Sequence, residues 1–329
     1  GSFDKEALRH GVRLAMVAAD LNIEECGFPD PDIAKGTYAY RTTGIGYGNI
    51  GGLLMALGIP YDSDEGRYFA GLLVSHLTAY CWEASQEMGE AFGPFREYED
   101  TKNDLAEVLR LHKACHDFLK EIREIRNPEE TMSEIVSRSG KLPTWGTLDG
   151  KAGLRALLNS FEQPGGDWDP LWLQAAKSLE NEDPWKGVNP EKVKRNSFVS
   201  LSAPGGTISA PLGIYDSGTT SIEPDYTLVK YKTLAGGGSM TMFNNLALKG
   251  LQTLGYDKWH VREAALEVAG INGLIVACDG NIQEAAAHLA EGCAKDEFGA
   301  VRAEFCNHAL PKDTTILDIV VALSEGKQT

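Results

Sequence analysis

The sequence lacks paired cysteines, an excess of basic residues and any apolar run long enough to cross a membrane. The six cysteines are scattered, with no C-x-x-C pair, at Cys26, Cys81, Cys115, Cys278, Cys293 and Cys306. In a chain without a recognisable secretion signal, this spacing predicts reduced thiols and a cytoplasmic protein. The formal net charge of −16 argues against a nucleic-acid partner and an anionic membrane surface, because both carry the same sign of charge.

The 329 residues are enough to bury a core and are typical of one large α/β unit. Apolar residues at helical spacing predict helices over residues 3–22, 52–57, 65–91, 101–126, 244–255, 259–270 and 283–291. Short apolar runs at 198–201 and 271–278 are typical of strands. Helices that alternate with short apolar strands favour a parallel α/β sheet.

One region interrupts this alternation. Residues 127–190 are rich in Trp, Pro and Gly, and their only clear helical pattern covers 170–179. We interpret the region as a surface excursion that is packed by its tryptophans, within a single α/β unit of residues 1–329.

The most informative segment runs from Asn196 to Lys232. Its apolar strand ends in a Pro-Gly-Gly turn, which presents backbone N–H groups without side chains in the way, as an anionic phosphate requires. A plain strand-to-loop turn is the alternative, because Pro-Gly and Gly-Gly are strong turn signals. The candidate phosphate loop is Ala203-Pro204-Gly205-Gly206-Thr207-Ile208-Ser209.

Three blocks, in this order, resemble the adenosylcobalamin-dependent (class II) ribonucleotide reductases. The first is RTTGIGYGNIGGLLM at 41–55, continued by PYDSDEGR at 60–67. The second is Gly93-Pro94-Phe95 with Tyr98 downstream. The third is APGGTI at 203–208, followed by GTTSIEPDYTLVKYK at 218–232 and by three glycines at 236–238. The resemblance is strong over about residues 36–112 and 196–256.

The resemblance implies a portion of the ten-stranded α/β barrel that these reductases share with glycyl-radical enzymes. It also implies reduction of a ribonucleoside di- or triphosphate by thiyl-radical chemistry, with adenosylcobalamin as cofactor and a thioredoxin-like reductant. The candidate loop would hold the substrate phosphates, although Gly205 stands where the family has Thr. Glu223 and Lys230 would lie near the phosphates or the cobalamin; a solvated or ion-paired strand edge is the alternative.

The family's N-x-C-x-E loop, which carries the radical cysteine, is absent from this sequence, as is its C-terminal cysteine pair. We therefore identify no catalytic residue in the chain. It is a fragment, one half of a split enzyme whose partner carries the radical cysteine, or a relative that has lost the activity. The competing hypothesis is a non-catalytic nucleotide-binding or assembly subunit derived from the same barrel.

The remaining histidines and cysteines give weaker signals. His112 and His116 are one helical turn apart, but without a third ligand they favour a polar helix face over a zinc site, and we expect no metal. Cys81 and Cys115 are interpreted as packed helix thiols. Cys278 ends an apolar run and is the cysteine best placed for a loop.

Overall fold

The computed structural model describes residues 3–145, 149–205, 219, 221–224, 227–233 and 239–295. The chain divides into two compact units, one of Gly1–Tyr47 with Ile59–Ala203 and one of Gly48–Gly58 with Pro204–Thr329. The sequence favoured a single unit, so this division differs from the expectation. None of the helices within the described ranges is both long and apolar enough to span a membrane.

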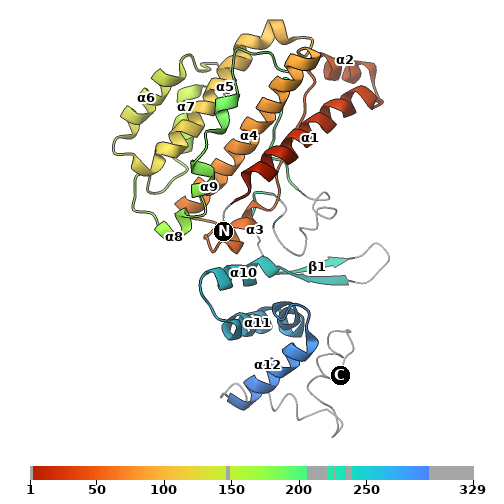
Figure 1. Ribbon diagram of the computed structural model, residues 1–329, viewed down its shortest axis with the longest axis vertical. Coiled ribbons are helices and arrows are strands. Elements are labelled where there is room, and N and C mark those ends of the chain that lie inside the picture. The colour runs from red at the N-terminus through yellow and green to blue at the C-terminus, as the bar shows by residue number, and fades with distance from the viewer. Residues whose placement is uncertain are drawn as a thin grey trace. The chain divides into compact units, whose positions relative to one another are not determined.

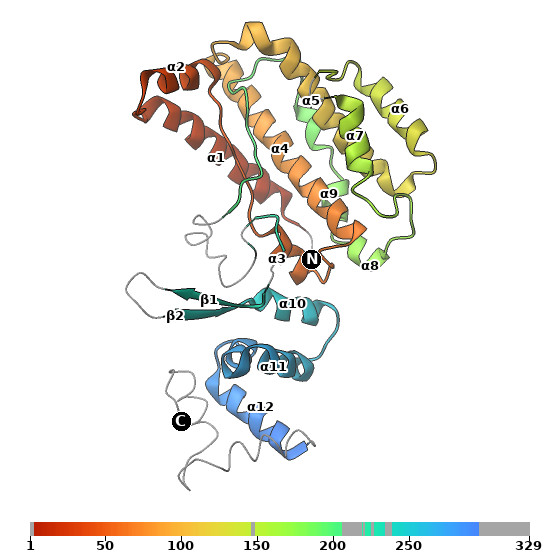
Figure 2. The same cartoon turned by 180° about the vertical axis from the view of Figure 1, so that it is seen from behind.

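The first unit is built from helices, with α1, α4 and α5 side by side and α6 and α7 against α5 (Figures 1 and 2). Its elements are α1 (Lys5–Glu25), α2 (Pro31–Tyr40), α4 (Asp64–Phe92), α5 (Tyr98–Glu121), η1 (Ile122–Glu124), α6 (Pro128–Ser139), α7 (Gly150–Leu158), α8 (Pro170–Leu173), α9 (Lys177–Glu180) and η3 (Pro184–Gly187).

Helix α4 is the central element of this unit. Ser63 caps its N-terminus, where the Ser63 hydroxyl accepts a hydrogen bond from the Gly66 N–H at 3.0 Å. Gly93 ends it with a φ of 87°, which a residue with a side chain rarely adopts. Its buried face joins one apolar cluster with side chains of α1 and α5, among them Met16 and Leu109. Predicted over 65–91, this helix is confirmed with only small changes at its ends.

The excursion at 127–190 contains more helix than the sequence indicated. Helices α6 and α7 were not predicted, and the helix expected over 170–179 is two short pieces, α8 and α9. Trp168 and Trp185 are buried, whereas Trp145 is exposed. The Trp168 ring stacks on Phe161, with centroids 5.7 Å apart.

The second unit contains α3 (Ile50–Ala56), β1 (Val229–Thr233), β2 (Ser239–Phe243), α10 (Asn245–Thr253), α11 (Lys258–Ala277) and α12 (Ile282–Lys295). Strands β1 and β2 pair antiparallel, and α3 packs on α10. The strand predicted over 271–278 is wrong, because these residues continue α11 beyond a kink at Gly270, where φ is 61°. An eight-residue apolar run does not by periodicity alone distinguish a strand from a buried helix.

The described residues contain this antiparallel pair and one parallel bridge, between Ile45 and Ser200. They form no barrel, so the ten-stranded barrel stays a prediction. A barrel closes only when every strand has a neighbour on both edges, and one bridged pair of short segments does not meet that condition.

Candidate functional site

The parallel bridge joins the two segments that the sequence singled out. The Thr43 and Ile45 N–H groups donate to the carbonyls of Phe198 and Val199, each at 2.9 Å, and the Leu201 N–H donates back to the Ile45 carbonyl at 3.2 Å. Because the pairing is parallel, the carboxyl ends of both segments lie at the same edge. In parallel α/β sheets ligands bind at that edge.

Glycine permits the close approach of the two segments. A Cβ at Gly44 would lie only 2.1 Å from the Cδ2 of Leu201, so any larger residue there would require the Leu201 side chain to move. The apolar alternation at 198–201 is only partly buried, since Val199 is 1% exposed but Phe198 is 49% exposed. The buried strand that the sequence predicted is thus short, and one of its faces is open.

At the carboxyl ends, the Tyr47 hydroxyl donates to the Ser202 hydroxyl at 2.8 Å. Ser202, Ala203 and Pro204, which follow the strand directly, are exposed. The first residues of the candidate phosphate loop therefore begin where the strand pair opens to solvent. The rest of that loop, Gly206, Thr207, Ile208 and Ser209, lies outside the described residues.

At the amino ends, a buried polar network joins the two segments to helices α1 and α4. The side-chain amide of Asn196 donates to Asp20 Oδ1 and to the Arg41 carbonyl, both at 3.0 Å. Its oxygen accepts from the Ser85 hydroxyl at 2.9 Å. Arg41 and Arg195 both pair with the Asp20 carboxylate, at 2.9 and 3.2 Å.

Arg41 is held in an unusual backbone conformation by this network. Its φ and ψ are both 47°, in the left-handed region, which costs a non-glycine residue about 1–2 kcal/mol. Burial alone would raise the pKa of Asp20, but the hydrogen bonds and charges of Arg41 and Arg195 outweigh it, and the pKa lies below its usual value. The Asp20 charge is therefore buried, 5% exposed, but fully paired.

In the second unit, the end of the first family-like block contacts the third block. Asn49, at a φ of 63°, accepts a hydrogen bond from the Thr219 N–H on its side-chain oxygen at 2.9 Å. The Ile50 N–H donates to the Ser221 carbonyl at 3.1 Å. A Cβ at Gly52 would lie 2.0 Å from Asn49 Oδ1, so this contact requires glycine there.

The two remaining candidate residues, Glu223 and Lys230, belong to this second unit. Glu223 is exposed, and its backbone carbonyl contacts the α3 segment, 2.8 Å from where a Cβ of Gly51 would stand. Lys230 lies in β1 opposite Met242 and is half-buried. Their proximity to phosphates or cobalamin stays a prediction.

The histidines of α5 do not form a polar face, which corrects the expectation. His116 is 1% exposed, and its Nδ1 lies 3.0 Å from the Ser75 hydroxyl. Burial lowers the pKa of His116 to about 3 and that of His112 to about 4, because both rings turn inward, toward α4 and Trp185. The described part of the chain contains no group of three side chains able to hold a metal ion.

Three cysteines of the described residues, Cys81, Cys115 and Cys278, lie in surroundings that disfavour the thiolate. Burial raises the pKa of the Cys81 thiol to about 12 and that of Cys115 to about 11, which confirms them as packed helix thiols. Cys278 is buried at the end of α11 and not in an open loop, and burial raises the pKa of its thiol as well. Cys306 lies outside the described residues.

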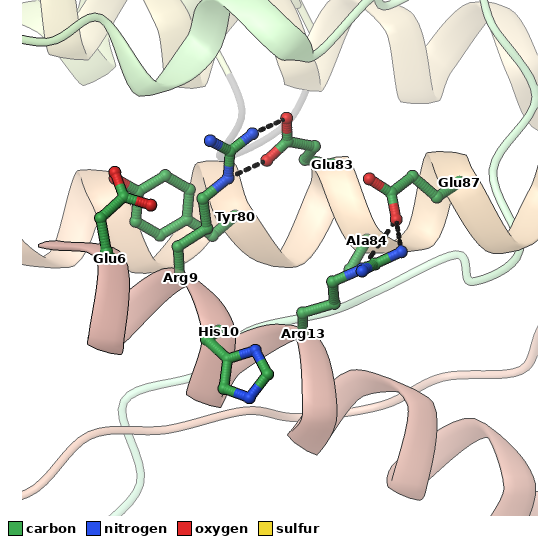
Figure 3. A pocket seen from close by; sticks show the side chains of 8 residues that line it. All are labelled: Glu6, Arg9, His10, Arg13, Tyr80, Glu83, Ala84 and Glu87. Carbon is green, nitrogen blue, oxygen red and sulfur yellow. Dashed lines mark hydrogen bonds and ion pairs between the residues drawn. The ribbon is translucent and has the colours of Figure 1, made fainter.

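Two cavities are found among the helices of the first unit, and one of them runs along the strand segment 197–200. The larger, about 390 Å³, is mostly apolar and is lined by Tyr40, Trp82, Phe95, Thr101, Asp104, Leu105, Val108, His112, Ser197, Phe198, Val199 and Ser200. A second, about 290 Å³, lies between α1 and α4 (Figure 3). Two ion pairs occupy its polar groups, Arg9 with Glu83 and Arg13 with Glu87.

Comparison with known proteins decides the family. The family described as "Ribonucleotide reductase, barrel domain" matches residues 1–286. This chain belongs to the ribonucleotide reductase barrel-domain family. The resemblance in the three sequence blocks is thereby confirmed.

Several relatives of this chain are named vitamin B12-dependent ribonucleotide reductase. Those from Agrobacterium fabrum and Bradyrhizobium diazoefficiens are each 32% identical to it, over 80% and 83% of this chain and 18% and 19% of their own lengths. The relative from Streptantibioticus cattleyicolor is also 32% identical, over 82% of this chain and 37% of its own length. The chain thus spans from under a fifth to under two fifths of the length of these relatives.

Sequence reasoning missed the buried network. Asp20, Arg41 and Asn196 are separated by 21 and 155 residues along the chain, and no local pattern connects them. The available signal was positional, because Arg41 opens the first family-like block and Asn196 opens the segment that ends in the candidate loop.

Proposed function

We propose that this chain is part of the catalytic barrel of a vitamin B12-dependent ribonucleotide reductase, and that its loop at 203–209 holds the phosphates of a ribonucleoside di- or triphosphate. The observation that carries the proposal is the parallel pairing of Ile45 with Ser200. It directs the chain from the carboxyl end of a strand straight into Ala203-Pro204-Gly205.

The proposed role of the loop is electrostatic positioning. Backbone N–H groups, together with the hydroxyls of Thr207 and Ser209, would bind the phosphate oxygens and orient the ribose toward the radical. The net charge of −16 opposes phosphate binding at long range, so the binding would rest on short-range hydrogen bonds that fix the anion in place.

The names of the relatives support adenosylcobalamin as cofactor of the complete enzyme. Two cavities of the first unit, of about 290 and 390 Å³, have the size of pockets for drug-like ligands, and neither of them is large enough for a corrinoid. We therefore derive no step through the cofactor from this chain. The radical cysteine and the contacts to a thioredoxin-like reductant would come from the parts of the enzyme that this chain does not contain.

The experiment is a calorimetric titration of the chain with ADP, ATP and adenosine. We expect binding that depends on phosphate, so that adenosine binds at least tenfold more weakly than ADP. Thr207→Val should weaken ADP binding about tenfold, because it removes one hydrogen bond to a charged group. Thr253→Val is the matched control, since Thr253 bonds only carbonyls of α3 and α10.

A pocket built from part of a barrel is incomplete, so the same titration is repeated on the complete reductase. Equal affinity for adenosine and ADP there, or an unchanged affinity in Thr207→Val, would contradict the proposed loop. A relative that only binds nucleotides would pass the titration but would not reduce ADP or ATP.

A further inference from the structure

We propose that Asn196 is a positioning residue, whose side-chain amide sets the register of the two parallel segments and thereby the place of the loop that begins at Ala203. This inference rests on the phosphate-binding function proposed for that loop. It concerns a residue that touches no substrate and acts through the strand that follows it.

The contacts of Asn196 use both donors of its side-chain amide and its oxygen acceptor. Both N–H bonds of the side chain are donated, one to Asp20 and one to the Arg41 carbonyl, and the oxygen accepts from Ser85. The backbone N–H of Asn196 also donates to the Ser85 hydroxyl, at 3.0 Å. The residue is 0% exposed. A carboxylate offers no donor and an apolar side chain offers neither donor nor acceptor, so few residue types could replace it.

The Asn196 bond to the Arg41 carbonyl lies in line with the rungs of the strand pair. Next to it, the Ser197 N–H donates to the Tyr40 carbonyl at 3.0 Å. The bonds of Thr43 to Phe198 and of Ile45 to Val199 follow in the same direction along the chain. The side-chain bond between Asn196 and Arg41 thus lies two residues ahead of the Thr43–Phe198 bond in both segments.

Helices α1 and α4 hold the Asn196 side chain in place. Asp20 belongs to α1 and Ser85 to α4, and these helices pack together through a shared apolar cluster. The Arg195 N–H also donates to the Ser85 carbonyl, at 2.9 Å. Asn196 is therefore held against both helices at once, and the strand that starts two residues later inherits its position.

Register matters here because the two faces of the strand differ. A shift by one residue moves a strand by about 3.3 Å and turns each side chain to the opposite face. It would expose Val199, which is 1% exposed, and bury Phe198, which is 49% exposed. The loop after Ser202 would move with the strand, and a misplacement of about 1 Å at a binding site can cost about a hundredfold in rate.

The test is residue-resolved hydrogen exchange of the whole chain, in the wild type and in Asn196→Ala. We expect the Ile45 and Leu201 amides, which form rungs of the ladder, to exchange at least tenfold faster in the variant. The amides in the middle of α4 should be unchanged. The matched control is Arg13→Ala, which breaks an exposed α1–α4 ion pair with Glu87 and leaves the strand segments intact.

Unchanged exchange at Ile45 and Leu201 in Asn196→Ala would overturn the proposal. So would equal acceleration in Arg13→Ala, because the effect would then come from a general loosening of α1. If Asn196→Ala does not fold, Ser85→Ala replaces it, since it removes only the two bonds between Ser85 and Asn196. The same exchange result is expected from it.

The loop is tested separately by ADP affinity. We expect Asn196→Ala to weaken ADP binding at least tenfold in the complete reductase, as a higher KM with a smaller change in kcat. Faster exchange with unchanged ADP affinity would overturn the link from register to loop and leave the phosphate site standing. A wild type that binds no ADP would overturn the phosphate site itself, while the exchange data would still decide the role of Asn196 in register.

Discussion

The two ends of the parallel strand pair differ sharply in burial. At the amino ends, Asp20, Arg41 and Asn196 are at most 5% exposed and bonded to one another. At the carboxyl ends, Leu201 is 39% exposed, and the exposed Ser202 accepts a hydrogen bond from the Tyr47 hydroxyl. The amino end is fixed by the helices, whereas Ser202, Ala203 and Pro204 at the carboxyl end are exposed to solvent. Binding segments are commonly drawn from such less stable parts of a fold.

The largest expected effect is on the free energy of unfolding, from a substitution in the buried network at the amino ends of the strand pair. Asp20→Ala should lower the free energy of unfolding by about 3–5 kcal/mol, because it leaves the buried Arg41 guanidinium without its main partner. Urea denaturation followed by circular dichroism measures it. Arg13→Ala, in an exposed ion pair of the same two helices, should cost at most about 1 kcal/mol. Equal losses in the two variants would show that burial of the network does not matter.

The next largest effect is the dependence of the free energy of unfolding on pH. His116 has a folded-state pKa of about 3, below the unfolded value, so its contribution to stability is complete above about pH 6.5 and is lost as the pH falls. At pH 5 the loss is about 2 kcal/mol for a histidine that stays neutral in the fold. His76, whose pKa burial also lowers, adds to it.

The His116→Gln variant isolates this contribution. Its unfolding free energy should fall less between pH 7 and pH 5 than that of the wild type, as measured by urea denaturation at each pH. An identical pH slope in the two proteins would show that His116 is not held neutral by burial.

A smaller effect is expected for the hydroxyl that supports Asn196. Ser85→Ala removes two buried hydrogen bonds and should cost about 1–3 kcal/mol. The same substitution at the open end, Ser202→Ala, should cost no more than about 0.5 kcal/mol. Thermal unfolding of the two variants side by side gives the contrast, and a reversed order would contradict the comparison between the two ends.

The smallest effect on stability is expected at Tyr47. Tyr47→Phe removes the same exposed hydrogen bond as Ser202→Ala and should likewise cost no more than about 0.5 kcal/mol. In the complete reductase the same variant should still raise KM for the nucleotide, because Ser202 immediately precedes the phosphate loop. Steady-state kinetics measure this change, and an unchanged KM would separate Tyr47 from the site.

Sequence patterns predicted the long helices well, because apolar spacing along α1, α4 and α5 matches the face that each helix buries. They failed for residues 271–278, where helix and strand share the same apolar run, and for α2 (Pro31–Tyr40), for which no helix was predicted. The network around Asn196 could not be predicted, since it depends on contacts between residues far apart in sequence. The motif placed the start of the candidate loop at the end of the strand, where the structure has Ala203, and phosphate binding by this loop stays a prediction.

The most direct measurement is a titration of the isotope-labelled chain with ADP, followed by NMR chemical shifts of the backbone amides. The account predicts that the largest shifts occur at Leu201, Ser202, Ala203 and Gly205, with little change at Asp20 and Ser85. Shifts centred on the α1–α4 groove of Arg9 and Glu83, or no difference between ADP and adenosine at the strand end, would contradict a phosphate site at the open end of the strand pair.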